Sequence, residues 1–176
     1  ITYVDGKDPL WLEDYRSFVD GTAMAKRFRD WGTLKYLLRG VEQHMPYIRN
    51  VYLVVSRESQ VPGWADTSNL KIVLHRDIIP EKFLPVFNSA AIELFLWRIR
   101  GLGEEFIYFN DDFYIINHVG VDRFFLNGLP RDIAVFQYNP SWSQWYVRIK
   151  NNIRLINPLQ ASFIAVRIKI IRPDIR

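Results

Sequence analysis

Two adjacent carboxylates, Asp111 and Asp112, follow Asn110 inside the apolar segment FIYFNDDFYIIN. The flanking residues are aromatic or β-branched, which is typical of a buried strand. Adjacent like charges repel each other, and burying a carboxylate without a partner is costly. Either these three polar residues form a turn, which Asn and Asp favour, or the carboxylates hold Mg²⁺ (or Mn²⁺) on a phosphate-bearing substrate.

A histidine at the end of a second apolar segment is a candidate for proton transfer. His75 closes the segment KIVLH, and Asp77 follows two residues later. A histidine held by a carboxylate can act as a general base near neutral pH or stabilise a phosphoryl oxygen, although a structural histidine gives the same pattern. Asp5 is the competing catalytic carboxylate, and Asp5-Gly6 is equally a turn sequence.

The segment KRFRDW supplies cationic groups directly before a predicted helix. Arg27 and Arg29 precede Asp30 there. Guanidinium groups and the backbone N–H groups of a helix N-terminus both bind phosphate. Arg39 lies on the helix that follows and reaches either the site or solvent. The alternative is a solvated basic run in which Asp30 caps the helix.

These polar residues lie at the ends of predicted elements. Apolar runs predict strands at residues 1–4, 51–55, 71–75 and 106–109. Helical spacing of apolar side chains predicts helices at residues 33–45 and 88–99, the second opened by the capping pair Asn88-Ser89 with Glu93 one turn further on. Apolar strands separated by helices favour a mostly parallel sheet covered on both faces. Since ligands bind beyond the carboxyl ends of such strands, the polar residues there predict a site.

Composition excludes several classes of protein. The 176 residues, 49% of them hydrophobic, are enough for one domain with a packed core. The absence of cysteine excludes disulfides, Cys-ligated zinc and a thiol nucleophile. Phosphate-binding glycine loops, G-x-S-x-G and H-E-x-x-H are all absent, which disfavours P-loop NTPases, dinucleotide dehydrogenases, α/β-hydrolases and zincins. No apolar run approaches the ~20 residues of a membrane span. The chain opens on ITYVDG without a signal-peptide pattern, so we expect its start to be trimmed.

The positive charge is concentrated at the carboxyl end of the sequence. Residues 148–176 carry seven Lys or Arg and one Asp, whereas the rest of the chain is slightly acidic. This end either meets an anionic membrane surface or charged polymer, or is a solvated strand face in which Arg167 and Lys169 alternate with apolar residues. No nucleic-acid-binding motif occurs, and no nucleic-acid partner is expected.

Five segments, taken in order, carry a family resemblance. They are YVDGKDPLW, RFRDWGTLKYLLRGVEQHMPYIRNVYLVVSRESQVPGW, KIVLHRDIIP, LPVFNSAAIELFLWRIRGL and FIYFNDDFY, within residues 2–114. Together they resemble the first two conserved regions of the Stealth family, the bacterial capsular-polysaccharide phosphotransferases related to the catalytic subunit of the Golgi N-acetylglucosamine-1-phosphotransferase. The chain departs from that pattern at Trp31 and Gly40, where Asn and Ser are usual.

The resemblance implies an activity and a fold. Such enzymes transfer a sugar-1-phosphate from a nucleotide sugar, typically a UDP-sugar, to a hydroxyl of an acceptor glycan and release UMP. The implied fold is α/β, with a mostly parallel Rossmann-like (GT-A-like) sheet flanked by helices. Residues 1–117 would form the nucleotide-sugar-binding catalytic core, and residues 118–176 a small extension packed on it. The expected location is the cytoplasm, peripheral at the inner face of a bacterial membrane, or the Golgi lumen in a eukaryote.

The resemblance also implies roles for the polar residues. His75, positioned by Asp77, is the expected base or transition-state donor, with Asp5 as its competitor, and Asp111 and Asp112 are the expected metal ligands. The expected substrate-binding residues are Gly6, Arg27, Arg29, Asp30, Arg39, Asn88, Ser89, Glu93, Arg98 and Asn110. Two other functions stay open: a metal-dependent glycosyltransferase that releases UDP, and a non-catalytic binding module for glycan assembly.

Overall fold

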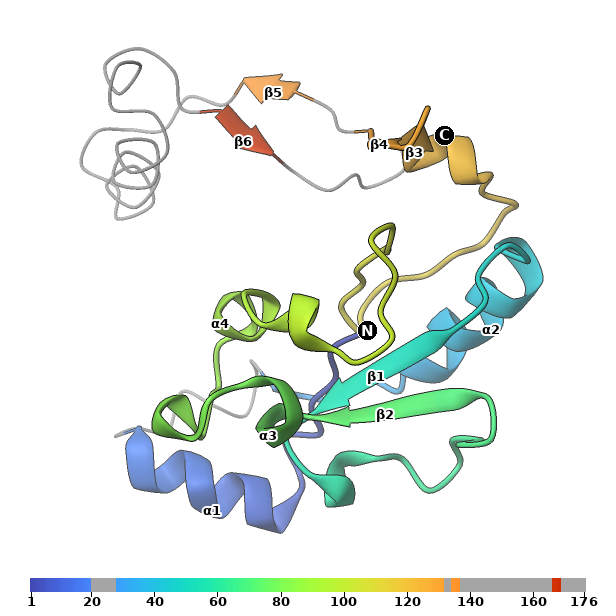
Figure 1. Cartoon of the computed structure of the whole chain (residues 1–176). Coiled ribbons are helices and arrows are strands. Elements are labelled where there is room, and N and C mark those ends of the chain that lie inside the picture. Colours follow the sequence, from blue (N-terminus) through green and yellow to red (C-terminus); the bar gives the residue numbers. More distant parts are fainter. Residues whose placement is uncertain (20–27, 132–133, 137–165, 169–176) are drawn as a thin grey trace, which may run out of the picture. The chain divides into compact units, whose positions relative to one another are not determined.

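The computed structural model describes residues 1–19, 28–131, 134–136 and 166–168. It divides into two compact units, Ile1–Val121 and Asp122–Arg176. The first unit is a mixed α/β structure built on a small parallel sheet of β1 (Val51–Val55) and β2 (Leu70–Leu74). Figure 1 shows the two strands side by side and pointing the same way.

Two further segments extend this sheet by isolated bridges. Thr2 forms parallel bridges with both Val54 and Asn110, so the amino-terminal segment lies between β1 and the segment that ends at Asn110. The predictions of full strands at residues 1–4 and 106–109 are therefore wrong in extent. A strand needs a repeated ladder, and the described backbone pairing between these two segments is one bond, from Thr2 N to Phe109 O at 3.2 Å.

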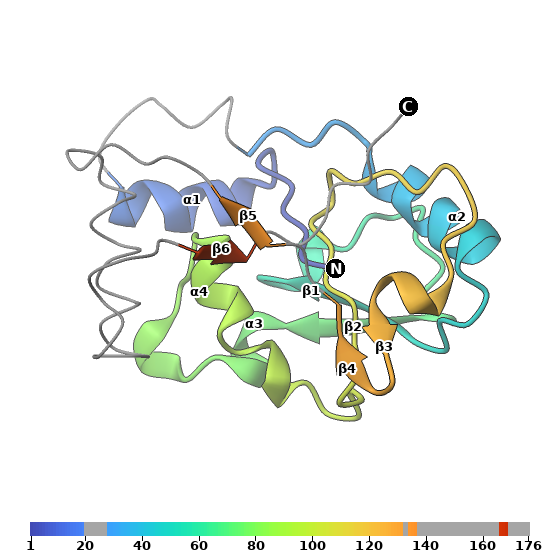
Figure 2. The ribbon, with the colours of Figure 1, turned by 90° about the horizontal axis from the view of Figure 1, so that it is seen from above.

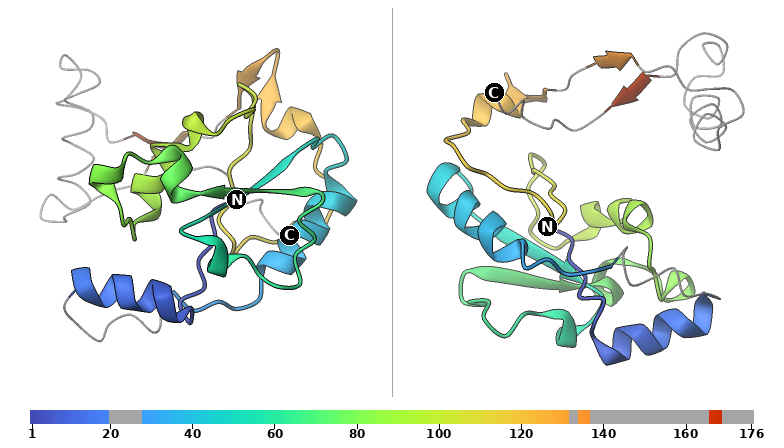
Figure 3. Two further views of the ribbon diagram at one scale, coloured as in Figure 1. Left: turned by 60° about the horizontal axis from the view of Figure 1, so that its bottom comes forward. Right: turned by 180° about the vertical axis from the view of Figure 1, so that it is seen from behind.

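The sheet is covered on both faces, as its apolar strands predict. Successive side chains of a strand point to opposite faces. Leu53 and Val55 belong to a buried cluster with Leu34, whereas Val54 belongs to a second cluster with Ile92. Figure 3 accordingly shows α2 (Leu34–His44) and α4 (Ser89–Glu93) on opposite sides of the strands.

The predicted helix at residues 33–45 is confirmed as α2. Leu34, Leu37 and Val41 are buried along one side of it, at the spacing that the sequence indicated. Gly40 lies on the same helix in close contact with another segment, because a Cβ built on it would approach the carbonyl oxygen of Ile115 to 2.5 Å.

The predicted helix at residues 88–99 is interrupted. It consists of α4 and a separate 3₁₀ turn, η3 (Leu96–Arg98). Phe95 N and Arg98 N each bond to a carbonyl three residues earlier, which tightens the backbone and stops the α-helical ladder. Ile92, Leu96 and Ile99 are nevertheless buried on one side, so the predicted apolar face is correct.

Helix α1 (Pro9–Phe18) is an element that the sequence did not predict. It lies on the side toward which the strands point, whereas α2 lies beside their amino halves (Figure 2). Asp8 caps α1 by accepting bonds from the backbone N–H groups of Leu10 and Trp11. The same carboxylate accepts bonds from Ser59 and Gln60 in the 3₁₀ turn η1 (Glu58–Gln60), which fixes α1 to the turn after β1.

The described part of the second unit consists of a 3₁₀ turn and short antiparallel pairs. Beyond η4 (Val121–Arg123), β3 (Phe125–Leu126) and β4 (Leu129–Pro130) form a hairpin. Its turn residues Asn127 and Gly128 both have positive φ, as an Asn-Gly hairpin turn requires.

A second pair joins β5 (Ala134–Phe136) to β6 (Val166–Ile168), which includes Arg167 of the basic carboxyl end. Lys169, Arg172 and Arg176 lie outside the described residues. The packing of the carboxyl-terminal extension on the core stays a prediction. Within the described part of the chain, no helix has the length and apolar character that a membrane span needs.

A candidate active site at the carboxyl end of the sheet

A cavity of about 300 Å³ lies in the first unit, beyond the carboxyl ends of the strands. Its wall includes Ser56 directly after β1, His75 directly after β2, and Asp111 after the bridged residue Asn110. Six of the residues predicted from the sequence line it: Arg29, His75, Ser89, Asn110, Asp111 and Asp112. The sequence predicted a site at this edge of the sheet, and the structure has a cavity there.

The acidic pair lies partly inside this cavity. Asp111 is half-buried and Asp112 is exposed. Burial raises the pKa of Asp111 to about 6, and the negative charges of Asp112 and Asp30 act in the same direction. The ionised form of Asp111 is thus disfavoured by its surroundings, and a nearby cation would reverse that penalty.

The donor set at the acidic pair fits Mg²⁺ held jointly with a substrate. In the part of the chain that the structure describes, no three His, Asp or Glu side chains gather into a complete metal cage. Mg²⁺ is commonly bound by one or two carboxylates together with substrate phosphates, and Asp111 with Asp112 supplies that number. Asp30 is near enough to act electrostatically on Asp111, and it accepts a hydrogen bond from the Tyr3 hydroxyl at 3.1 Å.

A polar network fixes the residue that precedes the pair. Asn110 Oδ1 accepts hydrogen bonds from Tyr108 at 2.6 Å and from Thr2 Oγ1 at 3.3 Å. The two hydroxyls are themselves 2.8 Å apart. Burial raises the pKa of the Tyr108 phenol, and the neighbouring Glu93 carboxylate adds to that effect. Glu93 therefore lies beside this network at the same edge, as predicted.

His75 is buried, with 6% of its surface exposed, and it begins the short helix α3 (His75–Ile78). Burial lowers the pKa of its imidazole to about 4, so the ring is neutral near pH 7. Asp77 does not hold this ring. Its Oδ2 accepts a hydrogen bond from Leu74 N at 2.9 Å, because the first turn of α3 needs a cap, and no hydrogen bond joins the two side chains among the described residues.

Arg29 brings a positive charge to the cavity. Its guanidinium lies 5.0 Å from the centre of the Trp31 ring, a cation–π arrangement. Asp30 Oδ1 accepts from Gly32 N at 2.7 Å in the turn before α2. Arg27 lies outside the described residues.

Arg39, Arg98, Asn88 and Asp5, like Gly6, Asp30, Asp77 and Glu93, are predicted site residues that do not line the cavity. Arg39 is exposed on α2 and Arg98 is exposed on η3. Asn88 caps α4 by accepting from Ala90 N at 3.0 Å. Asp5 Oδ1 accepts from Lys7 N at 2.9 Å, which is the turn interpretation of this sequence.

Gly6 serves a close contact between two segments. Gly6 N donates to Phe28 O at 3.0 Å, and a Cβ at position 6 would approach the same oxygen to 2.2 Å. Since Phe28 lines the cavity, this contact shapes one of its walls. Gly6 thus acts through packing in the described structure.

The sequence argument missed an aromatic wall and a hydroxyl. Trp11 contacts Phe28 and Phe87 edge-on, with ring centres 4.9 and 5.5 Å apart, and all three line the cavity. Such residues look like ordinary core in a sequence. Ser56 also lines the cavity, and the strand-end argument used for His75 would have found it.

Comparison with known proteins decides the family. Residues 27–132 match the family model described as Stealth protein CR2, conserved region 2. The chain belongs to the Stealth family. The resemblance drawn from its motifs is thereby confirmed.

Named relatives of this Stealth chain are bacterial phosphotransferases. It is 36% identical over 154 residues to a capsular polysaccharide phosphotransferase of Streptococcus thermophilus, covering 82% of the chain and 64% of the relative. It is 40% identical over 163 residues to an exopolysaccharide phosphotransferase of Lactiplantibacillus plantarum, covering 89% and 48%. With a receptor polysaccharide phosphotransferase of Streptococcus oralis the identity is 43% over 141 residues, covering 74% and 42%. The chain thus spans less than two thirds of the length of each of these relatives.

Proposed function

We propose that this Stealth chain carries the donor-binding part of a phosphotransferase in capsular or exopolysaccharide synthesis. Its reaction would transfer a sugar-1-phosphate from a UDP-sugar to a glycan hydroxyl and release UMP. The observation that carries this proposal is one cavity lined by an acidic pair, a guanidinium and a neutral histidine. The names of the relatives, all polysaccharide phosphotransferases, support the reaction class.

The order of the paired segments supports a Rossmann-like (GT-A-like) fold for this site. Across the sheet the order is β2, β1, the segment of Thr2 and the segment of Asn110. In chain order this is 3-2-1-4, the first four positions of the doubly wound order 3-2-1-4-5-6. Such sheets bind nucleotides where the order reverses, here between Thr2 and Asn110, and both residues line the cavity.

Asp111 and Asp112 are the proposed ligands of Mg²⁺ (or Mn²⁺). When bound, the cation would neutralise charge on the diphosphate of the donor. Arg29 would bind phosphate oxygens through its guanidinium, and Trp31 would hold that group in place. Asn110, fixed by Tyr108 and Thr2, would keep the pair at the cavity edge.

His75 is the proposed acceptor of the proton from the attacking hydroxyl. The ring is neutral near pH 7 and lines the cavity, so one ring nitrogen carries no proton. Burial makes it a weak base, and the negative charge of a bound diphosphate would strengthen it. The bond that forms joins the acceptor oxygen to the phosphorus that carries the sugar. The bond that breaks joins this phosphorus to the oxygen bridging it to UMP, and UMP leaves with that oxygen.

Product analysis tests this proposal. The full 176-residue chain is incubated with Mg²⁺, a bacterial glycan acceptor and, separately, UDP-glucose, UDP-galactose or UDP-N-acetylglucosamine. Acceptor-dependent release of UMP supports the proposal, and release of UDP would indicate a glycosyltransferase. Binding of a UDP-sugar without turnover would indicate a binding module.

The basic carboxyl end is proposed to contact an anionic membrane surface or charged glycan. Seven basic residues and one acidic residue within 148–176 carry this proposal. Such binding to vesicles of anionic lipid should weaken as salt rises, since the Debye length is about 8 Å at physiological ionic strength.

A further inference from the structure

Ser56 places an unpaired hydroxyl in the wall of the cavity. It follows β1 directly and lines the cavity. Its Oγ is buried and has no hydrogen-bond partner among the described residues. Buried hydroxyls are nearly always hydrogen-bonded, because an unpaired one loses its contacts with water without replacement. An unpaired hydroxyl in a cavity wall is therefore well placed to hydrogen-bond a ligand.

Three other serines of the first unit have hydrogen-bond partners. Ser59, three residues later, donates to the carboxylate of Asp8. Ser17 Oγ donates to Asp14 O at 2.6 Å, and Ser68 Oγ donates to Asp66 Oδ1, also at 2.6 Å. The fold thus satisfies hydroxyls that are more exposed than that of Ser56.

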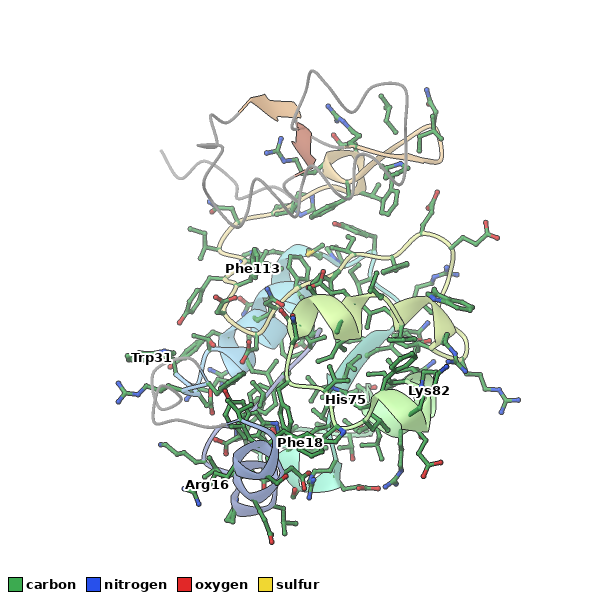
Figure 4. All side chains as sticks on the ribbon, turned by 90° about the vertical axis from the view of Figure 1, so that its left-hand side faces the viewer. Arg16, Phe18, Trp31, His75, Lys82 and Phe113 are labelled. Carbon is green, nitrogen blue, oxygen red and sulfur yellow. The ribbon has the colours of Figure 1, made fainter. Side chains whose placement is uncertain are left out.

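On the β2 side, the strand-end neighbour of Ser56 is His75. The parallel register pairs Val55 with Leu74, so Ser56 and His75 are the residues that directly follow the two strands. Figure 4 shows His75 among the packed side chains, whereas Trp31 lies at the edge of the unit and points outward.

The charged groups of the cavity come from other segments. Arg29 precedes α2, and the acidic pair follows Asn110, on the far side of Thr2 from β1. Ser56 and His75 therefore form an uncharged corner that can both donate and accept hydrogen bonds. A neutral hydroxyl suits this corner better than a phosphate group, which would be drawn toward Arg29 and a cation.

We propose that Ser56 is a substrate-binding residue whose side chain hydrogen-bonds a sugar hydroxyl beside His75. This inference rests on the proposed function. The hydroxyl belongs either to the sugar of the donor or to the acceptor glycan. A hydroxyl of either molecule would make the same hydrogen bond to Ser56, and the experiments below distinguish the two.

Ser56→Ala is the first test, with Ser59→Ala as the matched control. Removing an unpaired hydroxyl should leave the melting midpoint unchanged or raise it, whereas Ser59→Ala should lower it by breaking the bond to Asp8. If the donor sugar is bound, Ser56→Ala weakens UDP-sugar binding by roughly 3- to 10-fold, the scale of one neutral hydrogen bond, and leaves UMP binding unchanged. If the acceptor is bound, donor affinity is unchanged and KM for the acceptor rises by a similar factor.

Ser56→Cys gives a second readout that does not depend on activity. The chain has no cysteine, so the variant carries a single thiol at the proposed contact. UDP-sugar should slow its alkylation by iodoacetamide more than UMP does if the donor sugar lies there. If the acceptor lies there, the glycan should slow it.

The inference is overturned if affinities, KM and alkylation rates are all unaffected while the wild type binds a UDP-sugar. A melting midpoint of Ser56→Ala as low as that of Ser59→Ala would instead show a structural hydroxyl. A wild-type chain that binds none of the three UDP-sugars would overturn the proposed function and this inference with it.

Discussion

Thr2 and Asn110 are joined twice, by a parallel β-bridge and by a hydrogen bond of 3.3 Å between Thr2 Oγ1 and Asn110 Oδ1. The amino-terminal segment thereby positions the acidic pair that follows Asn110, although more than 100 residues separate them in the chain. Tyr108 completes the arrangement through its bond to the same oxygen.

The acidic pair should be essential for turnover but not for folding. Asp111→Asn and Asp112→Asn should each lower kcat by roughly 10²-fold, the scale for losing one group that stabilises charge in the transition state. Asn can still occupy the turn, so the melting midpoint should not fall. Asp66→Asn, an exposed acid outside the cavity wall, is the matched control and should keep full activity. Wild-type activity with an unchanged Mg²⁺ dependence in both variants would exclude the metal role.

Stability should depend on pH through Asp111. Its pKa is about 6 in the folded protein, above its ordinary value of 3.8, because burial disfavours the charge. The folded state therefore holds this proton more tightly than the unfolded chain does, so protonation stabilises the fold as pH falls from about 6 to 4, and this contribution is lost above pH 6. The difference in melting midpoint, wild type minus Asp111→Asn, should therefore be larger at pH 4 than at pH 7.

His75 titrates in the opposite sense over the same range. Burial lowers its pKa to about 4 from 6.5, so acidification through this window costs stability. Both proteins contain His75, and its effect cancels in the difference between them. A difference that is equal at pH 7 and pH 4 would contradict the role assigned to burial at Asp111.

His75→Ala should reduce kcat strongly while leaving the affinity for the UDP-sugar nearly unchanged, the pattern of an interaction made in the transition state. Affinity is measured by calorimetry and kcat by UMP release. His118→Ala, at an exposed position outside the cavity wall, is the control. A loss of affinity as large as the loss of rate would make His75 a ground-state contact instead.

Gly40→Ala should destabilise the first unit even though alanine is the better helix former. Propensity alone favours alanine by about 1 kcal/mol, but its Cβ would lie 2.5 Å from Ile115 O, and relieving such overpacking costs about 1–3 kcal/mol. Gly63→Ala is the control, since nothing lies within 4 Å of its Cβ position. Urea denaturation measures both free energies of unfolding, and a Gly40→Ala variant as stable as wild type would contradict the contact.

Regular elements with a strong local pattern were predictable from the sequence. VYLVV is apolar throughout and forms β1, and the helical spacing of Leu34, Leu37 and Val41 marks α2. The extent of pairing at residues 1–4 and 106–109 was not predictable, because a ladder depends on the partner strand and not on the apolar run itself. The break after α4 likewise arises from three-residue backbone bonds that residue spacing does not reveal.

The candidate site was predictable where it follows from strand ends and not where it depends on side-chain partners. His75 and Asp111 were found because each follows an apolar segment. Asp77 was expected to hold His75 because the two residues are close in sequence. Its carboxylate instead accepts a hydrogen bond from the backbone N–H of Leu74. Ser56 also follows an apolar strand, so the same argument would have found its position, but its lack of a hydrogen-bond partner is visible only in the structure.

At the ends of β1 and β2 the buried cluster gives way to the cavity wall within one residue, whereas Tyr3 and Ile92 belong to both a cluster and the wall. Val55 and Leu74 belong to a buried cluster, and the very next residues, Ser56 and His75, line the cavity. The side chain of Ser56, which belongs to neither cluster, can therefore be exchanged while the clusters keep their composition. A library at position 56 that leaves His75 and the acidic pair unchanged would therefore vary the polar contact in the cavity wall on a constant scaffold.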